Sequence, residues 1–267
     1  MQTRANLACE FAVFISRKVT RVSPRVPVKL QFINTKKMKY TKVIKAKFLA
    51  RPNRFIAYCE VDGKIETVHV KNTGRCRELL VSGATVYLSV SDNPERKTKY
   101  DLIVVAKETP RGTIMINMDS QAPNAAAYEW IQSGGIFGEG ATVRREVTYG
   151  NSRFDLYVEQ GKRRAFVEVK GVTLEKDGVA SFPDAPTERG IKHINELIAA
   201  QNDGFEAYIL FVVQMKGIHT FTPNDETHKA FGDALRHAAE SGVNILAYDC
   251  RVTPYEMAID ATINIEL

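Results

Sequence analysis

Between residues 40 and 107, apolar and polar positions alternate over short stretches, the pattern of β-strands with one buried face. The Asp62-Gly63 pair separates two of these stretches and is typical of a tight hairpin turn. Arg75–Leu80 is compatible with one helical turn. The expected strands are Thr41–Leu49, Phe55–Val61, Ile65–Val70, Ala84–Val90 and Tyr100–Ala106. Five short strands in about 70 residues favour a small barrel, with an OB-type barrel as the leading candidate.

The pattern changes after Pro110-Arg111-Gly112, which predicts a boundary between two domains. We expect an OB-like β-barrel over residues 38–112 and a mixed α/β domain over residues 113–267. Asn124 is a candidate N-cap for a helix at Ala125–Gln132. Three strands are expected next, at Val143–Thr148, Ser152–Val158 and Arg164–Val169.

The C-terminal part of the chain alternates helices with strands. Thr187 can cap a helix that runs to about Asn202 and is closed by Gly204. The unbroken apolar run Tyr208–Val213 predicts a strand buried on both faces, as in a parallel sheet. The remaining elements are a helix at Thr227–Glu240, a strand at Val243–Tyr248 and a weakly alternating tail, Met257–Leu267, that could add an edge strand.

Composition places the chain among ordinary soluble globular proteins. It has 267 residues, of which 44% are hydrophobic and 25% charged. No apolar run approaches the length of a membrane span, so we expect no membrane partner. The four cysteines, Cys9, Cys59, Cys76 and Cys250, are far apart and form no C-x-x-C pair. They favour reduced thiols and a cytoplasmic location over a disulfide framework or a zinc site.

The net charge of +6 is concentrated at the N-terminus. Residues 1–37 carry eight Lys or Arg and one acid, whereas 29 basic and 30 acidic residues lie in the remainder. Any basic surface beyond residue 37 must therefore be local. Because residues 1–37 lack clear periodicity, we expect a disordered or loosely attached extension, or one lying upstream of the true start. A basic arm that contacts nucleic acid is the alternative.

The candidate chemistry lies on two consecutive expected strands. Asp155 is near the middle of one, and Glu168-Val169-Lys170 ends the next. Glu168 and Lys170 share a face, and hairpin pairing would bring Asp155 within reach. Two carboxylates and an ammonium can hold a hard divalent cation, Mg²⁺ or Mn²⁺, beside a bound water. An exposed ion pair is the alternative, although the strand is apolar and buried charges are costly there.

The order helix, three strands, helix, strand, with Asp155 on the second strand and Glu168-x-Lys170 on the third, resembles the PD-(D/E)xK nuclease core, which is similar in fold to restriction-type endonucleases. Six stretches in order also look like the sugar fermentation stimulation protein A family of bacteria and archaea. This resemblance covers nearly everything from Met38 onward. It implies an OB-like N-terminal domain, a PD-(D/E)xK-type C-terminal domain and non-specific DNA binding. The stretches are ARPNRF (50–55), NTGRCRELL (72–80), RKTKYDL (96–102), YGNSRFD (149–155), VEVKGVTL (167–174) and FPDAPTERGIKH (182–193).

The nuclease resemblance also implies roles for single residues. Asp155 and Glu168 would be metal ligands, with the Val169 carbonyl as a candidate third. Lys170 would orient or help deprotonate the attacking water and stabilise the charge on the phosphate. Glu129 occupies the helix where such folds often carry an additional acid, so it is a candidate ligand. A solvated helix-surface glutamate is the alternative.

Further candidates lie around this set. Asp184, Arg189 and His193 are candidate site-lining residues, with loop-fixing or structural roles as the alternative. Basic residues interleaved with aromatics suit single-stranded nucleic acid, although strand aromatics are often core and surface arginines often only solvated. The candidate nucleic-acid-binding residues are Arg51, Arg54, Arg75, Arg77 and Arg96 in the barrel and Arg153 before Asp155.

These observations favour a Mg²⁺- or Mn²⁺-dependent phosphodiesterase that acts on DNA with little sequence specificity. The first alternative is a non-catalytic DNA-binding protein, such as a regulator of sugar metabolism, built on a nuclease-like fold. The second is a carbohydrate-acting enzyme that uses the two carboxylates, but the lysine beside Glu168 fits a metal site better. No helix-turn-helix with a basic recognition helix is evident, which argues against sequence-specific regulation.

Overall fold

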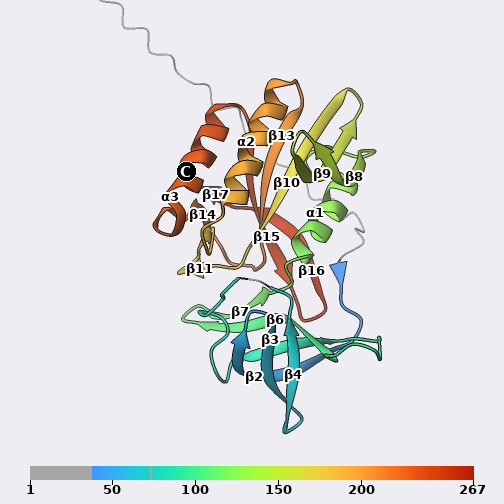
Figure 1. Cartoon of the computed structure of the whole chain (residues 1–267), viewed down its shortest axis with the longest axis vertical. Coiled ribbons are helices and arrows are strands. Elements are labelled where there is room, and N and C mark those ends of the chain that lie inside the picture. Colours follow the sequence, from blue (N-terminus) through green and yellow to red (C-terminus); the bar gives the residue numbers. More distant parts are fainter. Residues whose placement is uncertain (1–37, 73) are drawn as a thin grey trace, which may run out of the picture. The chain divides into compact units, whose positions relative to one another are not determined.

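The computed structural model describes residues 38–72 and 74–267. The expected N-terminal extension, residues 1–37, lies outside the described residues. The described residues belong to one compact unit, in which a β-barrel is followed by a mixed α/β domain (Figure 1).

The barrel is a six-stranded sheet in the order β4-β3-β2-β5-β6-β7, and parallel pairing of β4 with β6 closes it. Alternate residues along each strand point inward, which is why Ala57, Val68, Val86 and Leu102 are fully buried. All five predicted strands are present, and the expected OB-like barrel is confirmed. The barrel adds a sixth strand, β7, to these five. Its strands are β2 (Val43–Asn53), β3 (Ile56–Val61), β4 (Lys64–Val70), β5 (Thr85–Val90), β6 (Tyr100–Thr109) and β7 (Gly112–Asn117).

The predicted domain limits need two corrections. The boundary at residue 112 is wrong, because Thr109 and Gly112 pair within a hairpin that joins β6 to β7. A Pro and Gly turn marks a hairpin as readily as a domain boundary. The barrel therefore continues to Asn117. At the other end, β1 (Met38–Lys39) pairs with β16 and so belongs to the C-terminal sheet.

The C-terminal domain is built on a seven-stranded mixed sheet in the order β1-β16-β15-β13-β10-β9-β8. The predicted buried strand is β13, which pairs in parallel with both β10 and β15. Each of its residues from Ala207 to Val213 is buried, as a strand covered on both faces requires. The other strands are β8 (Thr142–Tyr149), β9 (Ser152–Gln160), β10 (Arg163–Val172), β15 (Asn244–Val252) and β16 (Glu256–Thr262), and β13 spans Glu206–Val213.

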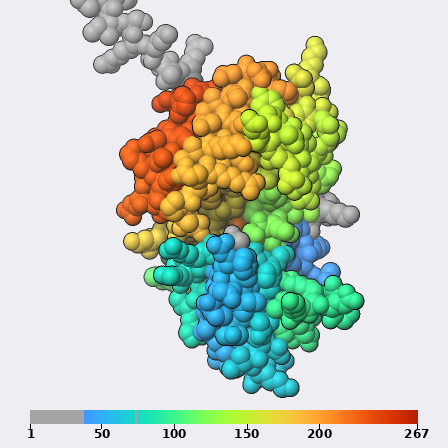
Figure 2. All heavy atoms as spheres, in the orientation of Figure 1, coloured from blue at the N-terminus to red at the C-terminus, as the bar shows by residue number. Residues whose placement is uncertain are grey.

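Helices cover both faces of this sheet. Helix α1 (Ala122–Gln132) packs on one face through Ala126, Ala127 and Ile131. Helices α2 (Glu188–Asn202) and α3 (Asp225–Glu240) pack on the other. In Figure 2, the gold and red-orange atoms of these two helices cover much of the sheet on the visible face.

A second, smaller sheet was not predicted. It has the order β11-β12-β14-β17, and two of its strands contain two residues each. Strands this short show no periodicity, and two of the three pairings are parallel and join distant segments. The strands are β11 (Glu175–Lys176), β12 (Val179–Phe182), β14 (Thr220–Pro223) and β17 (Asn264–Ile265).

The helix starts show one success and one error. Thr187 caps α2 as predicted, because its side chain accepts a hydrogen bond from the Gly190 N–H. Asn124 does not cap α1. That helix begins at Ala122 after Gln121, with Pro123 in its first turn, where a missing N–H costs nothing. Asn124 is therefore inside the helix, and its side chain is free to make a tertiary contact.

No helix in the described part of the chain is long and apolar enough to cross a membrane. Cys59, Cys76 and Cys250 are buried and free, as expected for reduced thiols. Cys9 lies outside the described residues.

Candidate metal and nucleic-acid site

The β9–β10 hairpin brings the three predicted catalytic residues together. The strands pair from Arg163↔Gln160 to Val167↔Leu156. Beyond that point the Val169 N–H donates to Asp155 Oδ2 over 2.8 Å. Asn124 of α1 donates to the other oxygen, Oδ1, over 2.7 Å. Asp155 is therefore held from β10 on one side and from α1 on the other.

Glu168 is buried, and its two carboxylate oxygens differ in their hydrogen-bond partners. Only 4% of its surface is exposed. Its Oε1 accepts hydrogen bonds from Lys170 Nζ over 2.7 Å and from His193 Nδ1 over 2.5 Å. Its Oε2 is buried without a hydrogen-bond partner among the described residues. The alternative of an exposed ion pair on a solvated strand is wrong, because Glu168 faces α2 inside the domain.

The two carboxyl groups differ in acidity. Burial raises the pKa of Asp155, and the nearby charge of Glu168 raises it further, against the opposing effect of the Val169 N–H. Burial alone would also raise the pKa of Glu168. The hydrogen bond from His193 and the positive charge of Lys170 outweigh it and keep the pKa of Glu168 below its usual value. Asp155 and Glu168 thus repel each other in their ionised forms, a repulsion that a cation between them would relieve.

Glu129 stays a predicted additional ligand. It lies five residues after Asn124 on α1, about 140° further around the helix, and Asn124 is the residue that reaches Asp155. Among residues 38–72 and 74–267, no group of three or more His, Cys, Asp or Glu side chains is arranged to hold a metal ion. The carboxylates that the contacts above place at the site are Asp155 and Glu168.

The structure separates the three predicted lining residues. His193 contacts Glu168 directly, and Arg189 Nε donates to His193 Nε2 over 3.4 Å. Asp184 instead packs against the barrel loop, where a Cβ on Gly74 would lie 2.3 Å from its Oδ2. It lines a polar cavity of about 160 Å³ that also includes Asn72, Ser120, Gly171 and Gln214.

Four of the predicted basic residues line one groove on the barrel. The groove has a volume of about 700 Å³, and Arg54, Arg75 and Arg77 are exposed along it. Arg54 lies over the ring of Phe55 at 5.6 Å, and 51% of Phe55 is exposed. Exposed guanidinium groups beside an exposed ring form a surface suited to a nucleic-acid backbone and its bases.

The fourth arginine of the groove, Arg51, has a different role. Its guanidinium donates to the backbone carbonyls of Arg54, Asn72, Gly74 and Arg75 over 2.7–2.8 Å. These hydrogen bonds fix the loop that carries Arg75. Arg51 shapes the groove and has few donors left for phosphate.

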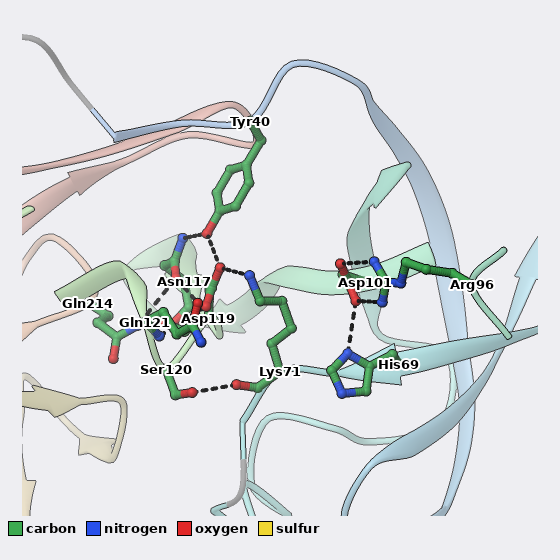
Figure 3. Close-up of polar contacts among 10 residues, drawn as sticks. All are labelled: Tyr40, His69, Lys71, Arg96, Asp101, Asn117, Asp119, Ser120, Gln121 and Gln214. Atoms are coloured by element: carbon green, nitrogen blue, oxygen red, sulfur yellow. Dashed lines mark hydrogen bonds and ion pairs between the residues drawn. The ribbon is translucent and has the colours of Figure 1, made fainter. Parts of the chain in front are cut away.

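Arg96 is also occupied within the barrel. It binds both oxygens of Asp101, and His69 contacts one of the same oxygens (Figure 3). Such a bidentate pair leaves Arg96 little capacity for a phosphate. Arg153 is 61% exposed and lies 3.6 Å from Glu146, a loose surface pair that a ligand could displace.

Sequence reasoning missed the contact from Asn124 to Asp155. The available signal was an Asn in a run of alanines, APNAAA. Asn is a poor helix former, so an Asn inside a helix often has a side-chain role. Reading it as a cap placed it outside the helix and hid that role.

Two family models match this chain. The SfsA N-terminal OB domain matches residues 49–116, and the sugar fermentation stimulation protein RE domain matches residues 121–256. A sugar fermentation stimulation protein homolog from Desulfitobacterium hafniense (strain Y51) is 60% identical over 216 residues, which cover 81% of this chain and 92% of the homolog. This chain belongs to the sugar fermentation stimulation protein (SfsA) family. A homolog from Clostridium beijerinckii is 55% identical over 80% of this chain and 93% of its own length.

A solved SfsA structure has the same fold. The Pyrococcus furiosus protein, described as SfsA in complex with Ca²⁺, superimposes with a TM-score of 0.77. It is 28% identical and covers 86% of this chain and 98% of its own. The two SfsA domain matches meet between residues 116 and 121, which agrees with the end of β7 at Asn117 and the start of α1 at Ala122.

Proposed function

We propose that this protein binds DNA with little sequence specificity and hydrolyses its phosphodiester bonds with a divalent metal ion, Mg²⁺ or Mn²⁺. One observation carries this proposal. Glu168 is a buried carboxylate with one oxygen held by Lys170 and His193 and the other without a partner, next to a second carboxylate, Asp155. A buried ionised oxygen without a partner is costly unless a cation binds it.

The residues present fit a hard cation. Oxygen ligands suit Mg²⁺, Mn²⁺ and Ca²⁺, and Asp155 and Glu168 would hold the ion, with water filling the remaining positions. The description of Pyrococcus furiosus SfsA as a Ca²⁺ complex supports a divalent cation in proteins of this fold. Such an ion supplies an activated water and a positive charge for the phosphate oxygens.

The protein's own groups supply orientation and charge. Lys170 Nζ, 2.7 Å from Glu168 Oε1, would place a positive charge beside the phosphate and orient the attacking water. The Val169 N–H and Asn124 would keep Asp155 fixed while the substrate binds. With the small sheet left aside, the helices and main-sheet strands follow the order α1, β8, β9, β10, α2, β13. Asp155 is on β9, and Glu168 and Lys170 are on β10, which supports a PD-(D/E)xK type of core.

DNA would bind through the barrel groove. Arg54, Arg75 and Arg77 would contact phosphates, while Phe55 would stack on a base. Backbone contacts of this kind carry no sequence information, so we expect the affinity to fall steeply with salt and to depend little on sequence.

The test is cleavage of supercoiled plasmid and of labelled single-stranded oligonucleotide in EDTA, Mg²⁺ or Mn²⁺. The Asp155→Asn variant is purified identically. Asp249→Asn is the matched control, because Asp249 is also a buried aspartate of the same sheet but pairs with Lys216 instead. We expect metal-dependent cleavage by the wild type and the control, and loss in Asp155→Asn. Cleavage that survives in Asp155→Asn would refute the assignment of the site.

One observation favours the second function, a DNA-binding regulator without catalysis. Two carboxylates are few for a catalytic metal centre, and among residues 38–72 and 74–267 no group of three or more His, Cys, Asp or Glu side chains is arranged to hold a metal ion. No cleavage under any condition, with salt-sensitive DNA binding unaffected by Asp155→Asn, would establish that alternative.

A further inference from the structure

His193 is fixed on the inner face of α2 from several directions. It is 6% exposed, and its ring meets that of Phe154 edge-on at 6.3 Å. It lies in the second turn of α2, whose start is set by the Thr187 cap. The ring therefore has a defined position relative to β9 and β10 before any ligand binds.

The hydrogen bonds of His193 define which nitrogen carries the proton. Arg189 has only N–H donors, so His193 Nε2 must accept the bond from Arg189 Nε at 3.4 Å. The proton is then on Nδ1, which donates to Glu168 Oε1 over 2.5 Å. Arg189, His193 and Glu168 thus form a chain of directed hydrogen bonds that ends on the carboxylate.

This chain determines which oxygen of Glu168 is free. His193 and Lys170 both bind Oε1, and Oε2 is left without a partner. With Lys170 alone, the carboxylate could turn and offer either oxygen to the ammonium. A second donor on the same oxygen, fixed on a different element, removes that freedom.

We propose that His193 is a positioning residue, which holds the Glu168 carboxylate so that Oε2 faces the divalent cation. The proposal rests on the proposed function, because it concerns the same metal site. Residues that orient a metal ligand in this way typically change metal affinity by about 10- to 100-fold when they are replaced. His193 itself does not touch the metal or the substrate.

The experiment measures Mn²⁺ affinity of EDTA-stripped, full-length protein without DNA, by calorimetry and by the electron paramagnetic resonance signal of free Mn²⁺. His193→Asn keeps an N–H donor near the position of Nδ1. His193→Gln carries its amide one carbon further away, and His193→Leu keeps the volume but has no donor. Glu168→Gln tests the site itself. His228→Leu is the control, because His228 is another partly buried histidine, which contacts the Thr187 N–H and Glu188 at the start of α2.

We expect Mn²⁺ affinity to fall about 10- to 100-fold in His193→Leu and His193→Gln and to be largely retained in His193→Asn. His228→Leu should lower the unfolding temperature without changing Mn²⁺ affinity. Wild-type Mn²⁺ affinity in both His193→Gln and His193→Leu would overturn the positioning role. The Glu168→Gln variant tests separately whether Mn²⁺ binds at Glu168. If His193→Leu does not fold, the Asn and Gln variants decide the question. Absence of Mn²⁺ binding in the wild type would refute the proposed metal site and the positioning role with it.

Discussion

Lys170 is the cation closest to the candidate ligand Glu168, at 2.7 Å. The Lys170→Met variant keeps both carboxylates but removes the positive charge that would stabilise the phosphate. We therefore expect cleavage to fall by about 10²- to 10³-fold. Mn²⁺ affinity should not fall, because a neighbouring positive charge opposes cation binding.

The control for this prediction is Lys192→Met. Lys192 is on α2 and donates to the backbone carbonyl of Asn151, away from the carboxylate pair. Initial rates of plasmid cleavage, together with Mn²⁺ titrations, separate the two effects. Near-normal cleavage by Lys170→Met would contradict the role given to this lysine.

The arginines of the barrel should divide into two groups. Arg75 and Arg77 are exposed in the groove, so Arg75→Ala and Arg77→Ala should each weaken DNA binding and reduce the salt slope by about 1. Arg51→Met and Arg96→Met should instead lower the free energy of unfolding, since their partners are backbone carbonyls and Asp101.

Fluorescence anisotropy with a labelled oligonucleotide at several salt concentrations, and urea unfolding, measure the two effects. A loss of affinity in Arg96→Met as large as in Arg75→Ala, at unchanged stability, would contradict this division.

Single residues show which contacts a sequence can predict and which it cannot. Asp155, Glu168 and Lys170 were recognisable because they lie on consecutive strands, where local pairing determines which side chains meet. Arg51 and Arg96 have partners that are remote or lie across a turn, such as the carbonyl of Asn72, and the sequence does not reveal these partners. A charge on the sequence does not reveal whether another group in the fold already neutralises it.

Among the elements, the first turn of α1 lies against β10 at Gly171. A Cβ there would lie 2.7 Å from Pro123 Cγ and 2.5 Å from Gln214 Oε1. Gly171→Ala should push the start of α1 away from β10 and cost about 1–3 kcal/mol of unfolding free energy. Urea unfolding tests this.

The matched variant is Gly161→Asn, in the β9–β10 turn. Gly161 has φ +60° and open space where a Cβ would lie, and Asn tolerates that conformation. We expect its unfolding free energy to remain close to that of the wild type. Equal stabilities of the Gly171→Ala variant and the wild type would show that α1 is not tightly packed on β10.

The elements found from sequence are those with strong periodicity or clear caps, such as β13 and α2. Those missed depend on pairings between distant segments. Strand β7 looked like the beginning of a new domain because only its pairing with β6 identifies it as part of the barrel. Strands β14 and β17 contain few residues and pair in parallel, so no local pattern marks them.

At the scale of the whole molecule, polar groups connect the barrel to the C-terminal domain. Gln214, which follows β13, donates to Asn117 O and to Asp119 O, while Lys71 binds Asp119 (Figure 3). Asp119 is 2% exposed, so this pairing is protected from solvent. The barrel groove and the carboxylate pair are thus held on one connected framework, as the proposed function requires.

A second link, between Lys107 of β6 and Glu175 of β11, makes the stability of the molecule depend on pH. Glu175 is 4% exposed and accepts bonds from Lys107 Nζ over 2.5 Å and from the Gly178 N–H over 2.8 Å. Burial alone would raise its pKa, but these bonds and the charge of Lys107 outweigh burial and hold the pKa of Glu175 below its ordinary value of 4.5.

Because the pKa is lower in the folded protein than in the unfolded chain, ionised Glu175 stabilises the fold above about pH 4.5, and this contribution is lost as the pH falls through the folded pKa. Glu175→Gln should therefore lower the free energy of unfolding by about 2 kcal/mol at pH 7, and the difference from the wild type should shrink below pH 4.5. The control is Glu108→Gln, which removes the charge of an exposed neighbouring glutamate that is bonded to Thr113. Urea unfolding of the wild type and both variants between pH 3.5 and 7 checks the prediction. The free energies of unfolding near pH 4 are decisive, because glutamate side chains titrate there. A difference that stays constant over this range would show that the link between the two domains does not depend on the charge of Glu175.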